Sequence, residues 1–549
     1  MPQFAIGVDY GTNSVRALVV DVADGREIAT AVYDYPSGDA GVLLDERDPN
    51  LARQNPADYI EGFRVVVRSA VQLAWKDATF SADEVVGLGI DTTGSSPIPI
   101  DADGRALALD PLFQNNLAAH CWLWKDHTGY AEAAEITEKA SAQGRPFLEK
   151  CGGTYSSEWF WSKILRCARV APDVFAAAYS WVELQDYVPA YVTGTSHPSK
   201  LKRGICAAGH KAMYHTSWGG LPDAEFLTTL DPRLGELRSR LYESTVSINE
   251  SVGGLTPEMA AATGLPVGLP VATGAFDAHL GAVGSGVRPG TLVKIMGTST
   301  CDIMVGDAST PDIPGVCGVV PGSVIPGMIG IEAGQSAVGD LFNWGTRVLG
   351  KSHEELTVGA EQLMPGESGL IALDWNNGNR TILVDPLLSG LIVGQSLHTT
   401  PSEVYRALVE ATAFGTLTII RQIEKSGVPV EEIVVCGGIG EKSPMTMQIY
   451  ADVCNRPFKT SRSAQTCALG SAIAGSVVGG AYGDFAQAIQ AMTGTKERVF
   501  VPNPASVAVY AKLYALYLDL HDAFGKTARH PNLQGLMKSL IAIRQEVRN

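Results

Sequence analysis

The sequence lacks any paired-cysteine motif. Its nine cysteines, an odd number among 549 residues, are scattered and never form a C-x-x-C arrangement. This distribution argues against a disulfide framework or a cysteine zinc site, and it is typical of a reducing cytosol. The opening residues, MPQFAIGVD, have no basic stretch before the apolar run and are not expected to be a signal peptide. We therefore expect a cytoplasmic protein.

Positive charge is also scarce. The chain has 42 Lys and Arg against 58 Asp and Glu, a formal net charge of −16. This balance argues against a dedicated partner of nucleic acid or of an anionic membrane. Residues 463–483 carry no charge and are long enough to span a bilayer, but they include Gln465, Thr466 and five glycines. We predict a small-residue helix packed inside the protein, with no membrane partner.

The common nucleotide motifs are missing too. There is no G-x-x-x-x-G-K-[ST] and no H-R-D with D-F-G, so neither a P-loop enzyme nor a protein kinase is indicated. What the chain has instead is one turn used twice, in IGVDYGTNSVRALVVD at residues 6–21 and VKIMGTSTCDIMV at residues 293–305. Backbone N–H groups in such turns can form an anion-binding nest, and Thr and Ser hydroxyls add donors. We predict two phosphate loops; two ordinary hairpins are the alternative.

Each half of the chain shows the same order of elements. A strand meander leads to a long helix and then to a short buried strand, the pattern of an α/β layer arrangement. The expected elements are strands at 4–8, 15–21, 27–35 and 85–91 with a helix at 57–75, then strands at 291–296, 301–305 and 432–436 with a helix at 402–427. Residues 281–290, GAVGSGVRPG, have the composition of a hinge. We predict two similar lobes, residues 1–286 and 287–549.

Three charged residues stand where phosphate chemistry would need them. Asp9 ends the first strand and could hold Mg²⁺, although a turn-capping aspartate is an equal alternative when the residue is taken alone. Arg16 offers a cationic donor to a phosphoryl group, or is a surface arginine. Asp277, in VATGAFDAH, could accept a proton from a substrate hydroxyl, or could cap a helix at Ala278.

Other candidates are weaker when each is taken alone. Gly437 and Gly438 follow a buried strand and allow close approach of a flat ligand such as adenine, but Gly-Gly turns also serve helix packing. Trp124 is more often a core residue than a sugar platform, and Lys211 more often a solvated lysine. His120, His127 and His279 lack H-E-x-x-H spacing, so packing in helices or turns is the favoured interpretation.

Taken together, these segments resemble the FGGY family of carbohydrate kinases, within the actin-like ATPase superfamily. The resemblance covers nearly the whole chain and rests on DYGTNSVRA, GAFDAH, MGTST and GGIGEKSPMTMQIYAD, in the family's order. It implies two actin-like, ribonuclease H-like lobes with a cleft between them, ATP as phosphoryl donor, and Mg²⁺. It implies that Asp277 is the catalytic base and that Asp9 serves the metal. The residues implied at the nucleotide are Gly11, Thr12, Asn13, Ser14, Arg16, Gly297, Thr298, Ser299, Gln335, Gly437, Gly438 and Lys442.

Within the family, the details are similar to the subgroup that phosphorylates L-ribulose at its C5 hydroxyl. WLWKDHT at 122–128, CAAGHKAMYH at 206–215 and GIEAGQSAVGD at 330–340 are in that subgroup's style. The similarity implies a sugar site made by Trp124, Lys211, Asp277 and Glu332, with Ser96 nearby where some relatives carry another small residue. Kinases of D-ribulose, ribitol or xylulose remain alternatives, and an actin-like ATPase without a sugar substrate is a remote one. A homodimer is possible.

Overall fold

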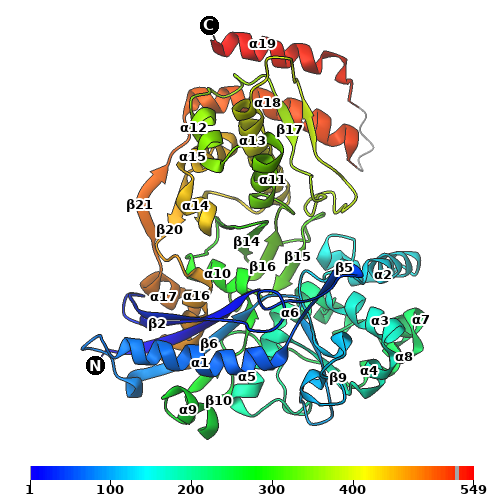
Figure 1. Cartoon of the computed structure of the whole chain (residues 1–549), viewed down its shortest axis with the longest axis vertical. Helices are drawn as coiled ribbons and strands as arrows, with labels where there is room; N and C mark the ends of the chain where they lie inside the picture. The colour runs from blue at the N-terminus through cyan, green and yellow to red at the C-terminus, as the bar shows by residue number, and fades with distance from the viewer. Residues whose placement is uncertain (1, 526–530, 549) are drawn as a thin grey trace.

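The computed structural model describes residues 2–525 and 531–548 and contains two seven-stranded mixed sheets, one from each half of the chain. In Figure 1 the first half forms the broad lower part and the second half the narrower upper part. The two sheets share a central plan, in which an antiparallel three-strand meander is joined to a parallel strand. The repeated order of elements in the two halves is thereby confirmed.

The first sheet has the strand order β10-β11-β6-β1-β2-β3, with β12 also paired to β6. Strand β1 pairs antiparallel with β2 and parallel with β6, as expected for a short meander followed by a crossover helix, α1 (Pro56–Ala74). The strands are β1 (Phe4–Tyr10), β2 (Ser14–Asp21), β3 (Glu27–Asp34), β6 (Val85–Thr92), β10 (Ser251–Gly254), β11 (Pro270–Ala272) and β12 (Ala275–Phe276).

The second sheet has the order β15-β16-β14-β13-β19-β20-β21. Its crossover helix is α13 (Pro401–Lys425), which begins with a capping box formed by Thr400 and Glu403. The strands are β13 (Thr291–Met296), β14 (Thr300–Gly306), β15 (Gly318–Pro321), β16 (Ile329–Ala333), β19 (Glu432–Cys436), β20 (Phe458–Ser461) and β21 (Thr495–Phe500).

Two helices are exchanged between the sheets. Helix α10 (Asp277–Gly284) follows the last strand of the first sheet but packs on β13 and β14. Helix α16 (Thr466–Val478) lies in sequence between β20 and β21 of the second sheet but packs on β1 and β6. The two helices also pack on each other, close to the junction of the two parts in Figure 1. One buried apolar cluster contains residues of both sheets and both helices. The small-residue helix expected within residues 463–483 is therefore confirmed as an internal helix.

The expected hinge at residues 281–290 is partly wrong. Residues 281–284 are the last turn of α10, and they are buried. Glycine in this segment allows close helix packing: a Cβ on Gly284 would lie 2.0 Å from the carbonyl oxygen of Thr466, and one on Gly470 would lie 1.8 Å from that of Leu280. Only residues after Gly284 form the connection to β13, and the division of the chain near residue 287 stays a prediction.

Residues 97–250 add a mostly helical region beside the first sheet, with its own apolar core. Its helices include α2 (Tyr130–Ala142), α3 (Phe160–Val170), α4 (Pro172–Ala177), α5 (Leu184–Thr193), α6 (Ile205–Lys211), α7 (Ala224–Leu230) and α8 (Pro232–Arg238). Around the second sheet lie α11 (Gly339–Leu349), α12 (His353–Glu361), α14 (Gly438–Lys442), α15 (Pro444–Cys454), α18 (Pro504–Phe524) and α19 (Leu536–Arg548).

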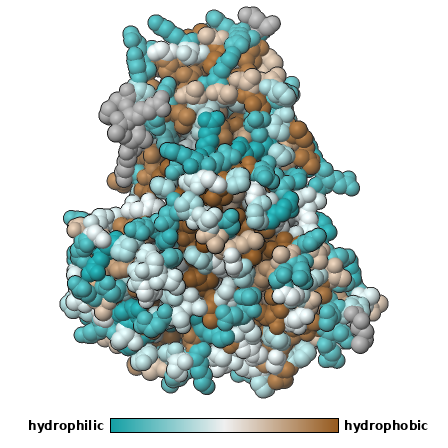
Figure 2. Space-filling view, turned by 180° about the vertical axis from the view of Figure 1, so that it is seen from behind, coloured by the Kyte–Doolittle hydropathy of each residue, from teal (hydrophilic) through white to brown (hydrophobic). Residues whose placement is uncertain are grey.

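Within the part of the chain that the structure describes, no helix is both long and apolar enough to cross a membrane. The face shown in Figure 2 mixes hydrophilic and hydrophobic residues and shows no continuous apolar belt.

We expect Gly89→Ala to destabilise the fold, because its Cβ would lie 2.0 Å from the carbonyl oxygen of Ser471 in α16. Overpacking of this kind costs about 1–3 kcal/mol, and here the obstacle is backbone, which cannot turn away. Denaturant unfolding measures the loss. Gly483→Ala is the matched control, since its Cβ would meet only the Gln487 side chain at 3.8 Å. Equal stability of the two variants would show that the close approach is not required.

Candidate active site

Three aspartates meet at one edge of the first sheet. Asp9 lies near the end of β1 and is the register partner of Asp91 near the end of the parallel strand β6. Asp277 follows β12, which also runs parallel to β6 and pairs Ala275 with Asp91. The carboxyl ends of parallel strands meet at the same edge of a sheet, the usual position for ligand chemistry in α/β proteins. The structure thus brings the predicted metal residue and the predicted base to one place, with Asp91 between their strands.

The environment of these carboxyl groups favours their neutral forms. Burial raises the pKa of Asp91 well above its usual value, and the nearby charge of Asp9 raises it further. Burial and the Asp9 charge likewise raise the pKa of Asp277 to about 7. The pKa of Asp9 is also raised by burial, although Arg16, whose guanidinium nitrogen lies 3.9 Å from the carboxylate, opposes the shift. A carboxyl group with a pKa near 7 is suited to act as a general base at neutral pH.

The capping role considered for Asp277 is also present in the structure. Asp277 is the first residue of α10, and its carboxylate accepts a hydrogen bond of 2.7 Å from the backbone N–H of Ala278. This bond fixes one carboxylate oxygen and lowers the pKa, although burial outweighs it. The two roles are compatible because a carboxylate has several acceptor positions.

The first predicted phosphate loop is the tight connection between β1 and β2. The backbone N–H of Gly11 donates to the carbonyl oxygen of Ser14 over 2.9 Å, and the Asn13 side chain donates to Ala40. The indole N–H of Trp124 donates to the hydroxyl of Thr12 over 3.0 Å. Trp124 is partly buried against a small apolar cluster, so its packing role and a contact to the loop coexist.

The second predicted phosphate loop lies beside the predicted adenosine segment. Gly297 N–H donates to Ser299, while the Gly297 carbonyl oxygen accepts from the N–H of Gly339 at the start of α11. Strand β13 runs parallel to β19, so Gly297 and Gly437 follow neighbouring strand ends. A Cβ on Gly437 would lie 2.5 Å from the carbonyl oxygen of Met296, which explains the need for glycine there. The exposed residues Gly438 and Lys442 belong to the short helix α14 that begins at this edge.

Lys211 and Glu332 form a buried ion pair between the two halves of the chain. The Lys211 ammonium, at the end of α6, donates to both carboxylate oxygens of Glu332 on β16, at 2.8 and 3.0 Å. Burial opposes both charges, but their attraction outweighs it, so the pKa of Lys211 is raised and that of Glu332 is lowered. The solvated lysine considered from sequence is therefore wrong for Lys211, which is 5% exposed.

Ser96 is held in place by buried polar groups that the sequence did not point to. Its N–H donates to the Glu183 carboxylate over 2.7 Å, and the neighbouring Ser95 hydroxyl donates to the same carboxylate. Lys163 donates to the carbonyl oxygen of Ser95. Burial raises the pKa of Glu183 and lowers that of Lys163. Glu183 and Lys163 thus both bind residues of this loop and hold Ser96 in position.

The surroundings of Gln335 differ from those expected of a nucleotide-binding residue. Its side chain is buried and donates to Asp374 and to the carbonyl oxygen of Thr412, while its oxygen accepts from Lys294 and Thr416. A side-chain amide with both donors and its acceptor engaged has little to offer a nucleotide. Its nucleotide contact stays a prediction.

Asp91 is the most important site residue that sequence reasoning missed. Its Oδ2 accepts a 2.6 Å hydrogen bond from Ser471 of α16, while its Oδ1 is buried without a hydrogen-bond partner. A signal was available in the sequence, because GIDTTG at residues 89–94 repeats the strand–Asp–turn order of GVDYGT at residues 7–12.

Solved structures share this architecture. A xylulose kinase from Rhodospirillum rubrum aligns with a TM-score of 0.78 and 24% identity, covering 95% of this chain and 100% of that chain. A Plasmodium falciparum glycerol kinase determined with ADP aligns with a TM-score of 0.76 and 15% identity, covering 94% and 98%. The chain therefore shares the fold of these two proteins.

The family follows from the sequence comparisons. The N-terminal and C-terminal domains of the FGGY family of carbohydrate kinases match residues 4–284 and 292–478. A ribulokinase from Halalkalibacterium halodurans is 41% identical over 99% of this chain and 98% of its own length. A ribulokinase from Geobacillus thermodenitrificans is 42% identical over 95% of each. The chain belongs to the FGGY family of carbohydrate kinases.

We expect Asp91→Asn to make the protein more stable at neutral pH. The folded-state pKa of Asp91 is raised, so stability is lost as the pH rises from the ordinary carboxyl pKa of the unfolded chain toward the folded-state pKa, and the neutral amide removes this cost. We expect Tm to rise by about 2 °C or more at pH 7 and the difference to vanish in acid. Thermal unfolding at acid and neutral pH measures the effect; a variant no more stable than the parent at pH 7 would contradict it.

Proposed function

We propose that the chain transfers the γ-phosphoryl group of ATP to the C5 hydroxyl of L-ribulose, as a ribulokinase of L-arabinose catabolism. The observation that carries the proposal is the position of Asp277, which lies at the same sheet edge as Asp9, is influenced by the charges of Asp9, Lys211 and Glu332, and has a pKa of about 7. Relatives named ribulokinase, 41% and 42% identical over nearly the whole chain, support the choice of sugar.

In the proposed reaction the Asp277 carboxylate accepts the proton of the C5 hydroxyl. The alkoxide oxygen forms the new bond to the γ-phosphorus, and the bond from that phosphorus to ADP breaks in line. Because little covalent chemistry falls to the protein, positioning and charge stabilisation supply most of the rate. The N–H groups and hydroxyls of Gly11–Ser14 and Gly297–Ser299 would surround the phosphates, with Arg16 as a cationic donor.

The residues present fit a bound Mg²⁺. Asp91 Oδ1 is a buried carboxylate oxygen without a hydrogen-bond partner, and Asp9 supplies a second carboxylate beside it. Hard cations such as Mg²⁺ prefer oxygen ligands. Mg²⁺ bound there would neutralise charge on the phosphates of ATP. Asp9 and Asp91 are the residues that would hold it, directly or through water.

The sugar is proposed to bind at the Lys211–Glu332 pair, which offers hydrogen-bond donors and acceptors to hydroxyl or keto oxygens. Trp124 would pack against the C–H surface of the sugar, and Ser96 would lie nearby. Gly437, Gly438 and Lys442 would contact adenosine. We also propose that the protein is cytoplasmic and that it forms a homodimer.

The pH dependence should report Asp277. Its carboxylate must be ionised to accept a proton, so we expect kcat/KM to rise with pH up to an apparent pKa of about 7 and then level off. Below that pKa the rate should fall about tenfold per pH unit. Asp277→Asn should lower kcat by about 10³-fold or more and abolish this limb, while sugar binding measured by calorimetry is kept. Near-normal kcat in this variant would show that another group is the base.

A coupled assay of ADP release with the four ketopentoses, ribitol and glycerol tests which substrate the enzyme prefers. We expect L-ribulose to give the highest kcat/KM. Either xylulose differs from L-ribulose at one carbon, whereas D-ribulose is its mirror image and differs at two. One hydrogen bond is worth only about 0.5–1.5 kcal/mol, so activity with xylulose within about tenfold of that value is compatible with the proposal. A best kcat/KM for ribitol or glycerol would move the chain to a sister activity of its family. ADP release that no sugar stimulates would favour an ATPase.

A further inference from the structure

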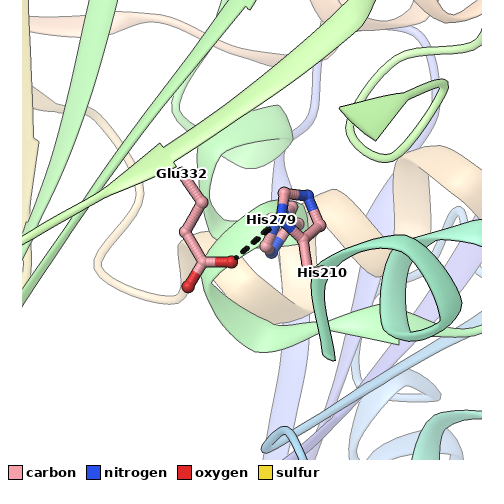
Figure 3. Close-up of side chains that lie close together, drawn as sticks. All are labelled: His210, His279 and Glu332. Atoms are coloured by element: carbon pink, nitrogen blue, oxygen red, sulfur yellow. Dashed lines mark ion pairs between the residues drawn. The ribbon is translucent and has the colours of Figure 1, made fainter. Parts of the chain in front are cut away.

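Two imidazoles and one carboxylate converge at the joint between the halves. His210 lies in the last turn of α6, His279 in α10 and Glu332 on β16, and one ligand atom from each lies within 4.8 Å of the others. Figure 3 shows the Glu332 carboxylate directed toward both rings. His210 and His279 are each 1% exposed. The reaction proposed above uses neither imidazole.

The hydrogen bond between His210 and Ser323 determines which ring nitrogen of His210 carries the proton. The Ser323 hydroxyl donates to the carbonyl oxygen of Val320, so its oxygen accepts from His210 Nε2, 2.9 Å away. A neutral imidazole with its proton on Nε2 has a lone pair on Nδ1. That nitrogen lies 3.2 Å from Glu332 Oε2, so two acceptors face each other at contact distance.

His279 also has ring nitrogens without partners close to the Glu332 carboxylate. Neither of its ring nitrogens has a hydrogen-bond partner, and its Nε2 lies 3.8 Å from the same Glu332 oxygen. Burial lowers the pKa of His279 to about 4 and that of His210 well below its usual value, so both rings are neutral at pH 7. Buried polar atoms without partners are costly. A cation shared by the two nitrogens and Oε2 would satisfy all three.

We propose that His210, His279 and Glu332 form a binding site for a divalent transition-metal ion of the zinc class. Imidazole ligands favour such ions over Mg²⁺, and two histidines with one glutamate leave a fourth position for water or substrate. In tetrahedral coordination with bonds of about 2.0–2.1 Å, ligand atoms stand about 3.3 Å apart. The His210–Glu332 distance of 3.2 Å already matches, whereas His279 Nε2, 3.8 Å from Glu332 Oε2, has to move closer. Ser323 would be the outer partner that orients His210.

The Lys211 ammonium is the one feature that opposes the ion. It contacts both oxygens of Glu332, so the metal would take Oε2 and leave Oε1 to the lysine. The rings of Trp159 and Phe276, 5.3 and 5.8 Å from the ammonium, offer it further stabilisation. Repulsion between the two cations nevertheless remains, and removing the lysine charge should tighten metal binding.

A metal ion at this site would compete with the sugar, an expectation that rests on the proposed function. If Glu332 binds the sugar, a metal ion on Oε2 competes with it. Zinc should then raise KM for the ketopentose in the parent enzyme, and His210→Gln should remove that part of the inhibition. Metal binding itself does not depend on the sugar, so it can be measured whatever the substrate is.

The test is calorimetric titration of the chelator-treated full-length protein with Zn²⁺, with Co²⁺ absorption as a spectroscopic readout. We expect His210→Gln and His279→Gln each to weaken this binding at least about a hundredfold, and Lys211→Met to strengthen it about tenfold or more. His521→Gln is the matched control, because His521 is also buried with an unpartnered nitrogen but lies against Trp375 and Tyr517. It should bind like the parent.

Circular dichroism and thermal unfolding establish that each variant is folded, and Zn²⁺ should raise Tm of the parent but not of the histidine variants. The proposal fails if the folded parent shows no Zn²⁺ binding that depends on His210 and His279. It also fails if Lys211→Met weakens the binding. Loss of kinase activity toward L-ribulose, with metal binding kept, would instead count against the proposed function alone.

Discussion

The structure depends on how closely helix α16 lies against the first sheet and helix α10. A Cβ on Gly7 would lie 1.7 Å from the carbonyl oxygen of Ala468, and one on Gly87 would lie 2.1 Å from that of Gly475. Contact is thus backbone to backbone over much of the helix. Close-packed interiors tolerate little added volume, so any larger side chain here would push the helix away from the sheet. The two halves are joined through this contact, because α16 belongs in sequence to one half and packs on the other.

The acidic edge follows from the same contact. Ser471 reaches Asp91 because Gly89, two residues earlier on β6, lets the helix approach. Asp277 opens the helix whose later turns pack on α16. The fold therefore holds three carboxyl groups at one sheet edge, with Asp91 buried and the other two partly exposed. Desolvation raises all three pKa values, and the charge of Asp9 raises those of Asp91 and Asp277 further. This arrangement is costly for the protein alone and would become favourable if a cation and a proton-donating hydroxyl were bound, as the proposed phosphoryl transfer requires.

Much of this could be predicted from the sequence, and the rest could not for physical reasons. The meanders, the parallel strands and the turns at Gly11 and Gly297 were predicted because strand periodicity and turn chemistry are local. The hinge at residues 281–290 was partly wrong because glycine has two uses, conformational freedom and close approach, and composition does not separate them. The sequence did not reveal the roles of Asp91, Glu183 and His210. These roles depend on contacts with residues that are far away in the sequence, namely Ser471, Ser96 and Glu332.

The Lys211–Glu332 pair shows why burial and function have to be considered together. A buried ion pair is weak evidence for stability, because desolvation consumes most of the Coulomb attraction. Removing one partner is nevertheless strongly destabilising, since the other charge is left buried alone. A ligand that enters between them must therefore replace what each loses, giving acceptors to the ammonium and donors to the carboxylate. Each partner comes from a different half of the chain, so a polyol that satisfied both would hold the halves together, whereas an apolar ligand of the same size would leave two charges unpaired.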